Sequence, residues 1–284
     1  MESFESYRGV KTCTDLGKER LARAKAQLAV TPRARVALVS PASVRSANAK
    51  EPATTNPTRE LDAMVLGNTL VGYGDNISLE NMMIIENLIK FSKLEADRET
   101  RDNLHPAAWH RAFLVCMEQM GCSVPIQASV EFRKRSASGT MKNVVTAIVK
   151  AGVDAAKAAI PGATVLAAVA DSTLAALEKE PELIQVFNYE VTKVKGMKLA
   201  LLPCEQTKNG LIIVSCSSIN QDSAVVGGGV LFLDLKITSL DIYQGSNFLA
   251  FNPAAYAEVK DDIEYVLGQH RREVLARRFP RRRS

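Results

Sequence analysis

Two cysteines, Cys204 and Cys216, lie in a stretch whose apolar and polar residues alternate as they do in β-strands. A thiol becomes a nucleophile when an imidazole takes its proton, and the two groups need proximity only in the fold. His105, His110 and His270 are the histidines that could supply this base. The residue types therefore allow a cysteine-dependent acyltransferase or hydrolase, and this function is kept as the alternative hypothesis.

The surroundings of the two cysteines favour inert thiols over catalysis. Neither residue lies at a strand-to-helix turn or at a helix N-terminus, where a thiolate is stabilised. Cys216 also continues the apolar face of Ile212 and Val214, which indicates a core position. We therefore expect that the protein is not an enzyme.

Metal and nucleotide sites are not indicated by the remaining motifs. His105, His110, Cys116 and Cys122 follow one another at intervals that match no zinc-binding pattern. A glycine run at 227–229 precedes a strand, whereas a phosphate-binding loop follows a strand and opens a helix. We expect no metal and no diffusible cofactor.

Positive charge is concentrated at the C-terminus. The chain of 284 residues carries a net charge of +5, and residues 269–284 contribute seven arginines against Glu273. The tail thus holds +6 and the rest of the chain about −1. A tail of this kind can bind anionic lipid or remain solvated, and the strands lack the aromatic residues of a base-stacking sheet. No nucleic-acid partner is expected.

The N-terminal half predicts a helical hairpin behind a polar linker. Residues 1–60 read as a first helix followed by a polar loop at 41–60, so the compact domain is expected at 61–268 and the basic tail at 269–284. Ser78 is a suitable N-cap for a helix at 79–96, and Pro106 opens a second helix that Gly121 ends.

The second half changes from alanine-rich helix to long strands. Helices are predicted at 141–159 and 163–179, after a strand at 124–132 that the basic residues 133–135 end. Strands are predicted at 186–194, 197–202, 211–217, 230–240 and 242–251, and a last helix from Pro253 to about residue 269. Asn209-Gly210 is a strong hairpin signal.

This order of elements resembles the Cyt-type and volvatoxin-type cytolysins, and by length and the absence of a signal sequence it is most similar to the Erwinia virulence factor family. The segments that carry the resemblance are MKNVVTAIVKAGVDAAKAAI and the strand series FNYEV, TKNGLIIVSC and GGGVLFLDLKITSLDI. The resemblance covers roughly residues 60–265. It implies an α/β fold of the α-β-α sandwich type, in which helical layers cover a mostly antiparallel sheet.

The resemblance also implies a non-enzymatic virulence or toxin-like protein that meets lipid membranes, with several copies assembling there. A fatty acid such as palmitate could be carried on Cys216, or on Cys204, which follows Pro203 and is expected near an accessible turn. No stretch is long and apolar enough for a membrane-spanning helix, so synthesis in the cytoplasm without a signal peptide and later delivery to host membranes are expected. The residues expected to contact lipid are Leu231, Leu233, Leu235 and Ile237 on one strand face and Arg277, Arg278, Arg281, Arg282 and Arg283 in the tail.

Overall fold

The computed structural model describes residues 13–30, 63–66, 69–100, 106–123, 130–160, 162–179, 197–221 and 236–278. The described helices are α1 (Cys13–Val30), α2 (Leu79–Glu99), α3 (Pro106–Gln119), α4 (Met141–Ala159), α5 (Leu166–Lys179), α7 (Pro253–Tyr256) and α8 (Lys260–Arg278). The strands are β1 (Ala63–Leu66), β2 (Thr69–Tyr73), β3 (Val130–Thr140), β4 (Met197–Gln206), β5 (Ile212–Gln221) and β6 (Lys236–Phe251).

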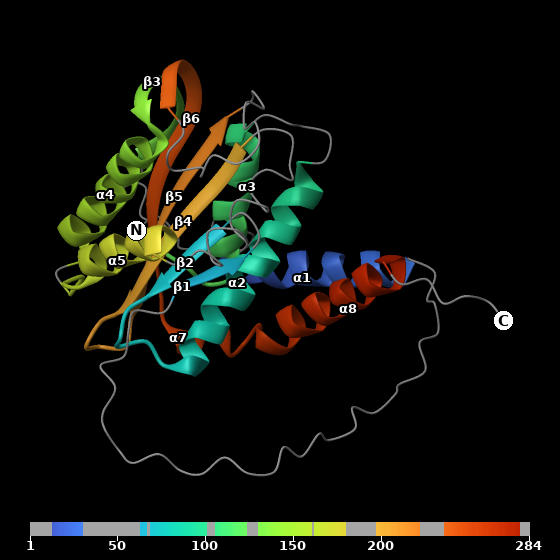
Figure 1. The fold of residues 1–284 in the computed structure, drawn as a ribbon. Helices are drawn as coiled ribbons and strands as arrows, with labels where there is room; N and C mark the ends of the chain where they lie inside the picture. The colour runs from blue at the N-terminus through green and yellow to red at the C-terminus, as the bar shows by residue number, and fades with distance from the viewer. Residues whose placement is uncertain are drawn as a thin grey trace, which may run out of the picture.

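The strands form one open sheet in the order β1-β2-β4-β5-β6-β3 (Figure 1). Only the β2–β4 pair is parallel among the described strands, and the other pairs are antiparallel. The predicted mixed α/β class with a mostly antiparallel sheet is confirmed. The predicted strand at 186–194 and the glycine run at 227–229 lie outside the described residues.

The helix starts follow the local signals in the sequence. The Ser78 side chain accepts a hydrogen bond from the Asn81 N–H, and Thr140 caps α4 in the same way through the Asn143 N–H. Gly121, with φ of 95°, follows α3 in the left-handed region that glycine tolerates. These three helices confirm the predicted positions of the hairpin and of the first alanine-rich helix.

The hairpin at Asn209-Gly210 joins β4 to β5 as predicted. Gln206 pairs with Ile212 across the turn, and Gly210 has φ of 82°, which a side chain would make unfavourable. The strand predicted at 197–202 runs on to Gln206. Pro203 keeps its pairing with Gly72 of β2, and the pairing with β5, which omits residues 202 and 203, resumes in the same register at Cys204.

Strands β3 and β6 are longer than the sequence indicates. The residues 133–135, predicted to end a strand, lie inside β3 and pair with residues 242–244. Likewise the predicted break at Asp241 is absent, because Asp241 pairs with Ser136 and β6 continues to Phe251. The long antiparallel partner pairs with β3 on both sides of two register shifts, and this outweighs the local effect of charged residues.

Helices cover both faces of the sheet (Figure 1). On one face, α4 and α5 pack on a cluster that includes Leu70, Leu201 and Phe248. On the other, α1, α2, α3 and α8 pack on a larger cluster that includes Leu202, Val214 and Phe251. The buried side chains of Leu21 and Ala24 place α1 in this larger core, although the sequence put residues 1–60 outside the compact domain.

The C-terminal helix is divided into two. The Asn252 side chain caps α7 through the Ala254 N–H, with Pro253 in the first turn, as predicted. The chain then leaves the helix and starts again at Lys260, so that Tyr256 and Val259 both become buried. Helix α8 continues through Arg278, into the region that the sequence assigned to the tail.

Candidate functional site

Cys204 and Cys216 lie on neighbouring central strands of the sheet. Cys204 on β4 pairs with Tyr73 of β2 and with Val214 of β5, while Cys216 on β5 pairs with Asn247 of β6. The alternation of the strands directs both thiols to the face covered by α2 and α3, where each belongs to the larger cluster. The expected core position of Cys216 is confirmed.

Both thiols are fully enclosed. Cys204 is 0% exposed and Cys216 is 1% exposed, so the expectation that Cys204 lies near an accessible turn is wrong. The reason is that β4 does not end at Pro203 but pairs on both sides through Cys204. The Cys204 thiol donates to the Leu202 carbonyl at 3.2 Å.

Burial makes both thiols poor nucleophiles. It raises the pKa of Cys216 to about 12 and the pKa of Cys204 well above its usual value of 9.0. The His110 side chain on α3 is also buried, which lowers its pKa to about 4 and keeps the imidazole neutral at physiological pH. These directions are the opposite of those that activate a cysteine.

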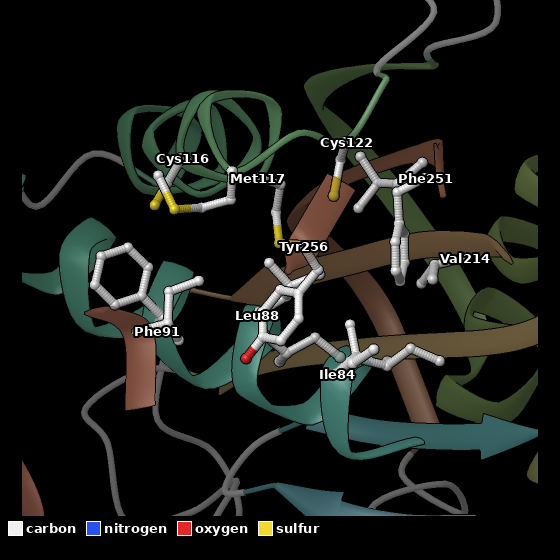
Figure 2. Packing of buried hydrophobic residues seen from close by; sticks show 14 of the residues in the cluster. Ile84, Leu88, Phe91, Cys116, Met117, Cys122, Val214, Phe251 and Tyr256 are labelled. Carbon is white, nitrogen blue, oxygen red and sulfur yellow. The ribbon is translucent and has the colours of Figure 1, made fainter. Parts of the chain in front are cut away.

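The two other described cysteines near His110 also serve packing. Figure 2 shows Cys116 and Met117 of α3 above Leu88 and Phe91 of α2, with Cys122 close to Phe251. Burial raises the pKa of Cys116 to about 12 and raises that of Cys122 too. Within the described ranges, no group of three or more His, Cys, Asp or Glu side chains could hold a metal ion, and His105 lies outside them.

The opposite face of the sheet, beneath α4 and α5, contains polar groups within its apolar surface. Ser215 of β5 is 0% exposed, and its hydroxyl has no hydrogen-bond partner in the part of the chain that the structure describes. Ser217, two residues along the same face, donates a long hydrogen bond of 3.4 Å to the Ile148 carbonyl of α4. An unpaired buried hydroxyl costs roughly 1–3 kcal/mol, so this contact between helix and sheet is not optimal.

Glu205 of β4 caps the N-terminus of α5. Its carboxylate accepts a hydrogen bond from the Val165 N–H at 2.9 Å, and the N–H groups of Thr164 and Leu166 also point to it. These N–H groups lie at the N-terminus of α5, where a negative charge is stabilised by the helix dipole. Glu205 is only 1% exposed, and the burial raises its pKa despite these three donors.

A glycine brings β2 against the middle of α5. Gly72 has no side chain, and a Cβ there would lie 1.7 Å from Thr173 Oγ1 and 2.9 Å from Thr173 Cβ. The Thr173 hydroxyl is fixed by a 2.6 Å hydrogen bond to the Val169 carbonyl of its own helix. The α4–α5 layer therefore has a hydrogen-bonded end at Glu205 and a close steric contact at Gly72.

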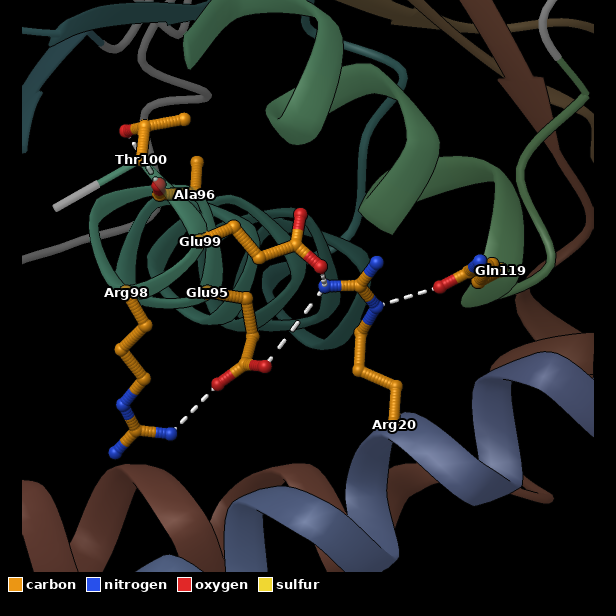
Figure 3. Close-up of polar contacts among 7 residues, drawn as sticks. All are labelled: Arg20, Glu95, Ala96, Arg98, Glu99, Thr100 and Gln119. Carbon is orange, nitrogen blue, oxygen red and sulfur yellow. Dashed lines mark hydrogen bonds and ion pairs between the residues drawn. The ribbon is translucent and has the colours of Figure 1, made fainter. Parts of the chain in front are cut away.

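The larger helical layer is held by charged groups as well as by its core. The Arg20 guanidinium of α1 contacts the Glu99 carboxylate at 2.6 Å and the Glu95 carboxylate at 3.8 Å, and it donates to the Gln119 side chain of α3 (Figure 3). Arg98 contacts Glu95 from the other side at 2.6 Å. This buried network joins α1, α2 and α3.

The residues predicted to contact lipid are mostly outside the described part of the chain. Leu231, Leu233, Leu235, Arg281, Arg282 and Arg283 fall outside it. Ile237 lies in β6, where its backbone pairs with Gly139, and Arg277 and Arg278 form the end of α8. Within the described ranges, no helix combines the length and the apolar character needed to cross a membrane.

The polar contacts that fasten α5 were not found from the sequence. The strand predicted at 197–202 ends before Glu205, so neither Glu205 nor Gly72 was assigned a contact with a helix. The available signal was the alternation itself, because it places Glu205 on the face opposite to Cys204 and therefore beneath a helix.

Comparison with known proteins identifies no family. No family profile and no curated protein matches the chain. A solved structure of the Evf virulence factor aligns with 76% of this chain and 83% of its own, with 9% sequence identity and a TM-score of 0.25. A TM-score of this size does not establish a common fold.

Proposed function

We propose that this chain is a non-enzymatic protein of the virulence or toxin type, and that it associates with host membranes when its α4–α5 layer leaves the sheet. In this proposal the two helical layers and the sheet form an α-β-α sandwich. The observation that carries it is the polar and sterically tight contact of α4 and α5 with a buried apolar sheet face. Ser215, Ser217 and Thr173 lie in this contact.

The two layers differ in how strongly they are held. The larger layer combines an extensive apolar cluster with the buried Arg20 network. The smaller layer rests on a smaller cluster, a long hydrogen bond from Ser217 and the cap from Glu205. If one layer separates from the sheet, this comparison favours α4–α5.

Magnitudes indicate that lipid is needed for the separation. Uncovering Leu70, Leu201, Ile213, Ile219 and Phe248 in water would cost on the order of 10 kcal/mol at roughly 2 kcal/mol for each side chain. The unpaired Ser215 hydroxyl offsets only a small part of this. At a bilayer, however, the apolar stripe of α4 (Val145, Ile148, Val149 and Val153) can enter the interface, as amphipathic helices do.

A fatty acid on Cys216 or Cys204 is a second part of the proposal. Because both thiols are enclosed in the larger cluster, an attached acyl chain would lie in the interior rather than on the surface. Burial of a palmitoyl chain is worth on the order of 10 kcal/mol at ~0.8 kcal/mol per CH₂. The intact mass of the protein from its native source tests this: an added acyl mass is expected, and the bare sequence mass excludes it.

The alternative function, a cysteine-dependent acyltransferase or hydrolase, gains no support from the described residues. It requires a thiolate, whereas burial holds Cys204 and Cys216 in the protonated form. The membrane proposal is therefore preferred.

A disulfide lock tests the proposed separation. In the variant Gly72→Cys/Thr173→Cys the two Cβ atoms start 2.9 Å apart, slightly closer than the ~3.8 Å of a disulfide, so α5 must move outward by about 1 Å to form it. The oxidised form should lose binding to vesicles that persists in high salt, and reduction should restore it. Equal salt-resistant binding by the oxidised and reduced forms would refute the proposal.

A further inference from the structure

The exposed side of α4 carries three lysines. Lys142, Lys150 and Lys157 are all exposed. Thr146 is the exposed residue on the same arc, and Ala147, Ala151 and Ala158 lie to one side of it.

The three lysines form one line along the helix. At 100° per residue they fall within about 80° of arc, and the line is about 22 Å long at 1.5 Å per residue. Asp154 is the one acidic residue of α4, and it lies near Lys150 and Lys157 on the exposed side. The face therefore carries a net charge of +2 from these four side chains.

We infer that this lysine face is a docking surface for the anionic headgroups of a lipid bilayer, and that docking precedes the separation of α4 and α5. The inference rests on the proposed function and adds to it the part of the molecule that first meets the membrane. Charge complementarity supports it, because a polybasic face is attracted to acidic phospholipids. The geometry supports it too, because three cations within about 80° of arc on one helix can contact one plane together.

A nucleic-acid duplex fits this face less well. A helix that enters a groove contacts phosphates on both of its flanks and presents side chains that read base edges between them. Here the cations lie on one line, and the exposed residue between them on the same arc is Thr146.

Docking through α4 would also act on the cap of α5. Lys157 lies close enough to Glu205 to favour its ionised form. A lipid phosphate that pairs with Lys157 competes for this charge and leaves the buried Glu205 carboxylate less stabilised. The same contact that holds the protein on the membrane thus weakens the fastening of the α4–α5 layer.

The test compares two variants that lose the same charge. The first is Lys142→Gln/Lys150→Gln/Lys157→Gln, and the matched control is Lys18→Gln/Arg23→Gln/Lys260→Gln, whose residues are exposed on α1 and α8. Sedimentation with vesicles that contain about 30% phosphatidylserine is measured at low salt, since salt screens such contacts. We expect the α4 variant to bind on the order of 100-fold more weakly, from ~1 kcal/mol per lysine, and the control to stay within about 3-fold of wild type.

A variant with one more positive net charge tests whether misfolding, and not loss of charge, explains weaker vesicle binding. Asp154→Asn should bind acidic vesicles about 5-fold more tightly than wild type, because it removes the one acidic side chain of the face. Equal losses in the α4 and control variants, unchanged binding by Asp154→Asn, or binding of a short DNA duplex in preference to vesicles would each overturn the inference.

Failure of the inference can be told from failure of the proposed function. Docking is the salt-sensitive part of binding and should remain in the oxidised Gly72→Cys/Thr173→Cys protein. Layer separation is the salt-resistant part and should be absent from it. If the locked protein keeps the salt-resistant part, the proposed function fails; if the α4 lysine variant keeps the salt-sensitive part, only the docking inference fails.

Discussion

Gly72 of β2 lies directly against Thr173 of α5, so closely that an added Cβ would come within 1.7 Å of the Thr173 hydroxyl oxygen. Thr173 cannot easily turn away, because its hydroxyl is bonded to the Val169 carbonyl and its side chain is 3% exposed. The distance between this helix and the sheet is therefore set by the absence of a side chain at Gly72.

Gly72→Ala should push α5 away from the sheet, because its Cβ would overlap Thr173. We expect a loss of roughly 1–3 kcal/mol in the free energy of unfolding, typical of overpacking, and tighter salt-resistant binding to vesicles because α5 starts farther from the sheet. Urea denaturation and vesicle sedimentation measure the two effects.

Gly17→Ala is the matched control in the other layer. A Cβ at Gly17 of α1 would lie 2.1 Å from the Gln119 carbonyl oxygen at the end of α3. It should destabilise the protein to a similar extent without increasing vesicle binding. If Gly72→Ala and Gly17→Ala increase vesicle binding equally, the cause is general destabilisation and not separation of α4–α5.

Glu205 should make the protein less stable as the pH rises. Burial raises its pKa in the folded state above the usual 4.5, so the folded state holds the proton more tightly than the unfolded state does. Its favourable contribution is full below pH 4.5 and is lost as the pH rises through the folded-state pKa. Acidification therefore strengthens the docking of α5 through this group.

Two substitutions at this position separate charge from hydrogen bonding. Glu205→Gln keeps an acceptor for the Val165 N–H and should match or exceed the wild-type melting temperature at neutral pH, with a difference that shrinks toward pH 4. Glu205→Ala removes the cap and should cost about 1 kcal/mol. Melting temperatures of the three proteins are measured from pH 4 to pH 8. If Glu205→Gln loses stability relative to wild type as the pH rises, the pKa of Glu205 is not raised in the folded state.

The Arg20 network should be costly to break from one side. Arg20→Met leaves the Glu95 and Glu99 carboxylates without their partner on α1, and Glu95 is only 9% exposed at its side chain. We expect a loss of roughly 1–3 kcal/mol, because Glu99 loses its 2.6 Å partner and the buried Glu95 keeps only Arg98. Adding Glu95→Gln to Arg20→Met should recover part of this loss in urea denaturation, and a double variant that is as unstable as the sum of the two single variants would contradict the coupling.

Local signals were sufficient to predict α2, α3, α4 and the central hairpin. Ser78 and the apolar stripe behind it define α2, and Asn209-Gly210 defines the β4–β5 turn. The core position of Cys216 followed from the alternation with Ile212 and Val214. Each of these features depends on residues a few positions apart, which is the range over which a sequence pattern is informative.

Features that depend on distant partners were not predicted. Glu205 caps a helix that starts 40 residues earlier, and Arg20 pairs with α2 some 79 residues along the chain. Helix α1 has too few apolar residues to be assigned to the core by itself, and Leu21 becomes buried only because α3 and α8 lie beside it. The length of β3 likewise depends on β6 rather than on its own residues.

Adjacent residues of β5 provide reporters for the two faces of the sheet. Ser217 lies under α4, where its hydroxyl contacts the Ile148 carbonyl, whereas Cys216 points to the larger cluster under α2 and α3. In the variant Ser217→Cys, a maleimide added with acidic vesicles should label residue 217 and leave Cys216 protected, because only the α4–α5 layer separates. Peptide mass spectrometry distinguishes the two positions, and the same sample without vesicles is the control. Labelling of Cys216 and Cys204 at the same rate as residue 217 would mean that lipid unfolds the whole domain, and labelling of Cys204 and Cys216 without residue 217 would mean that the other layer opens.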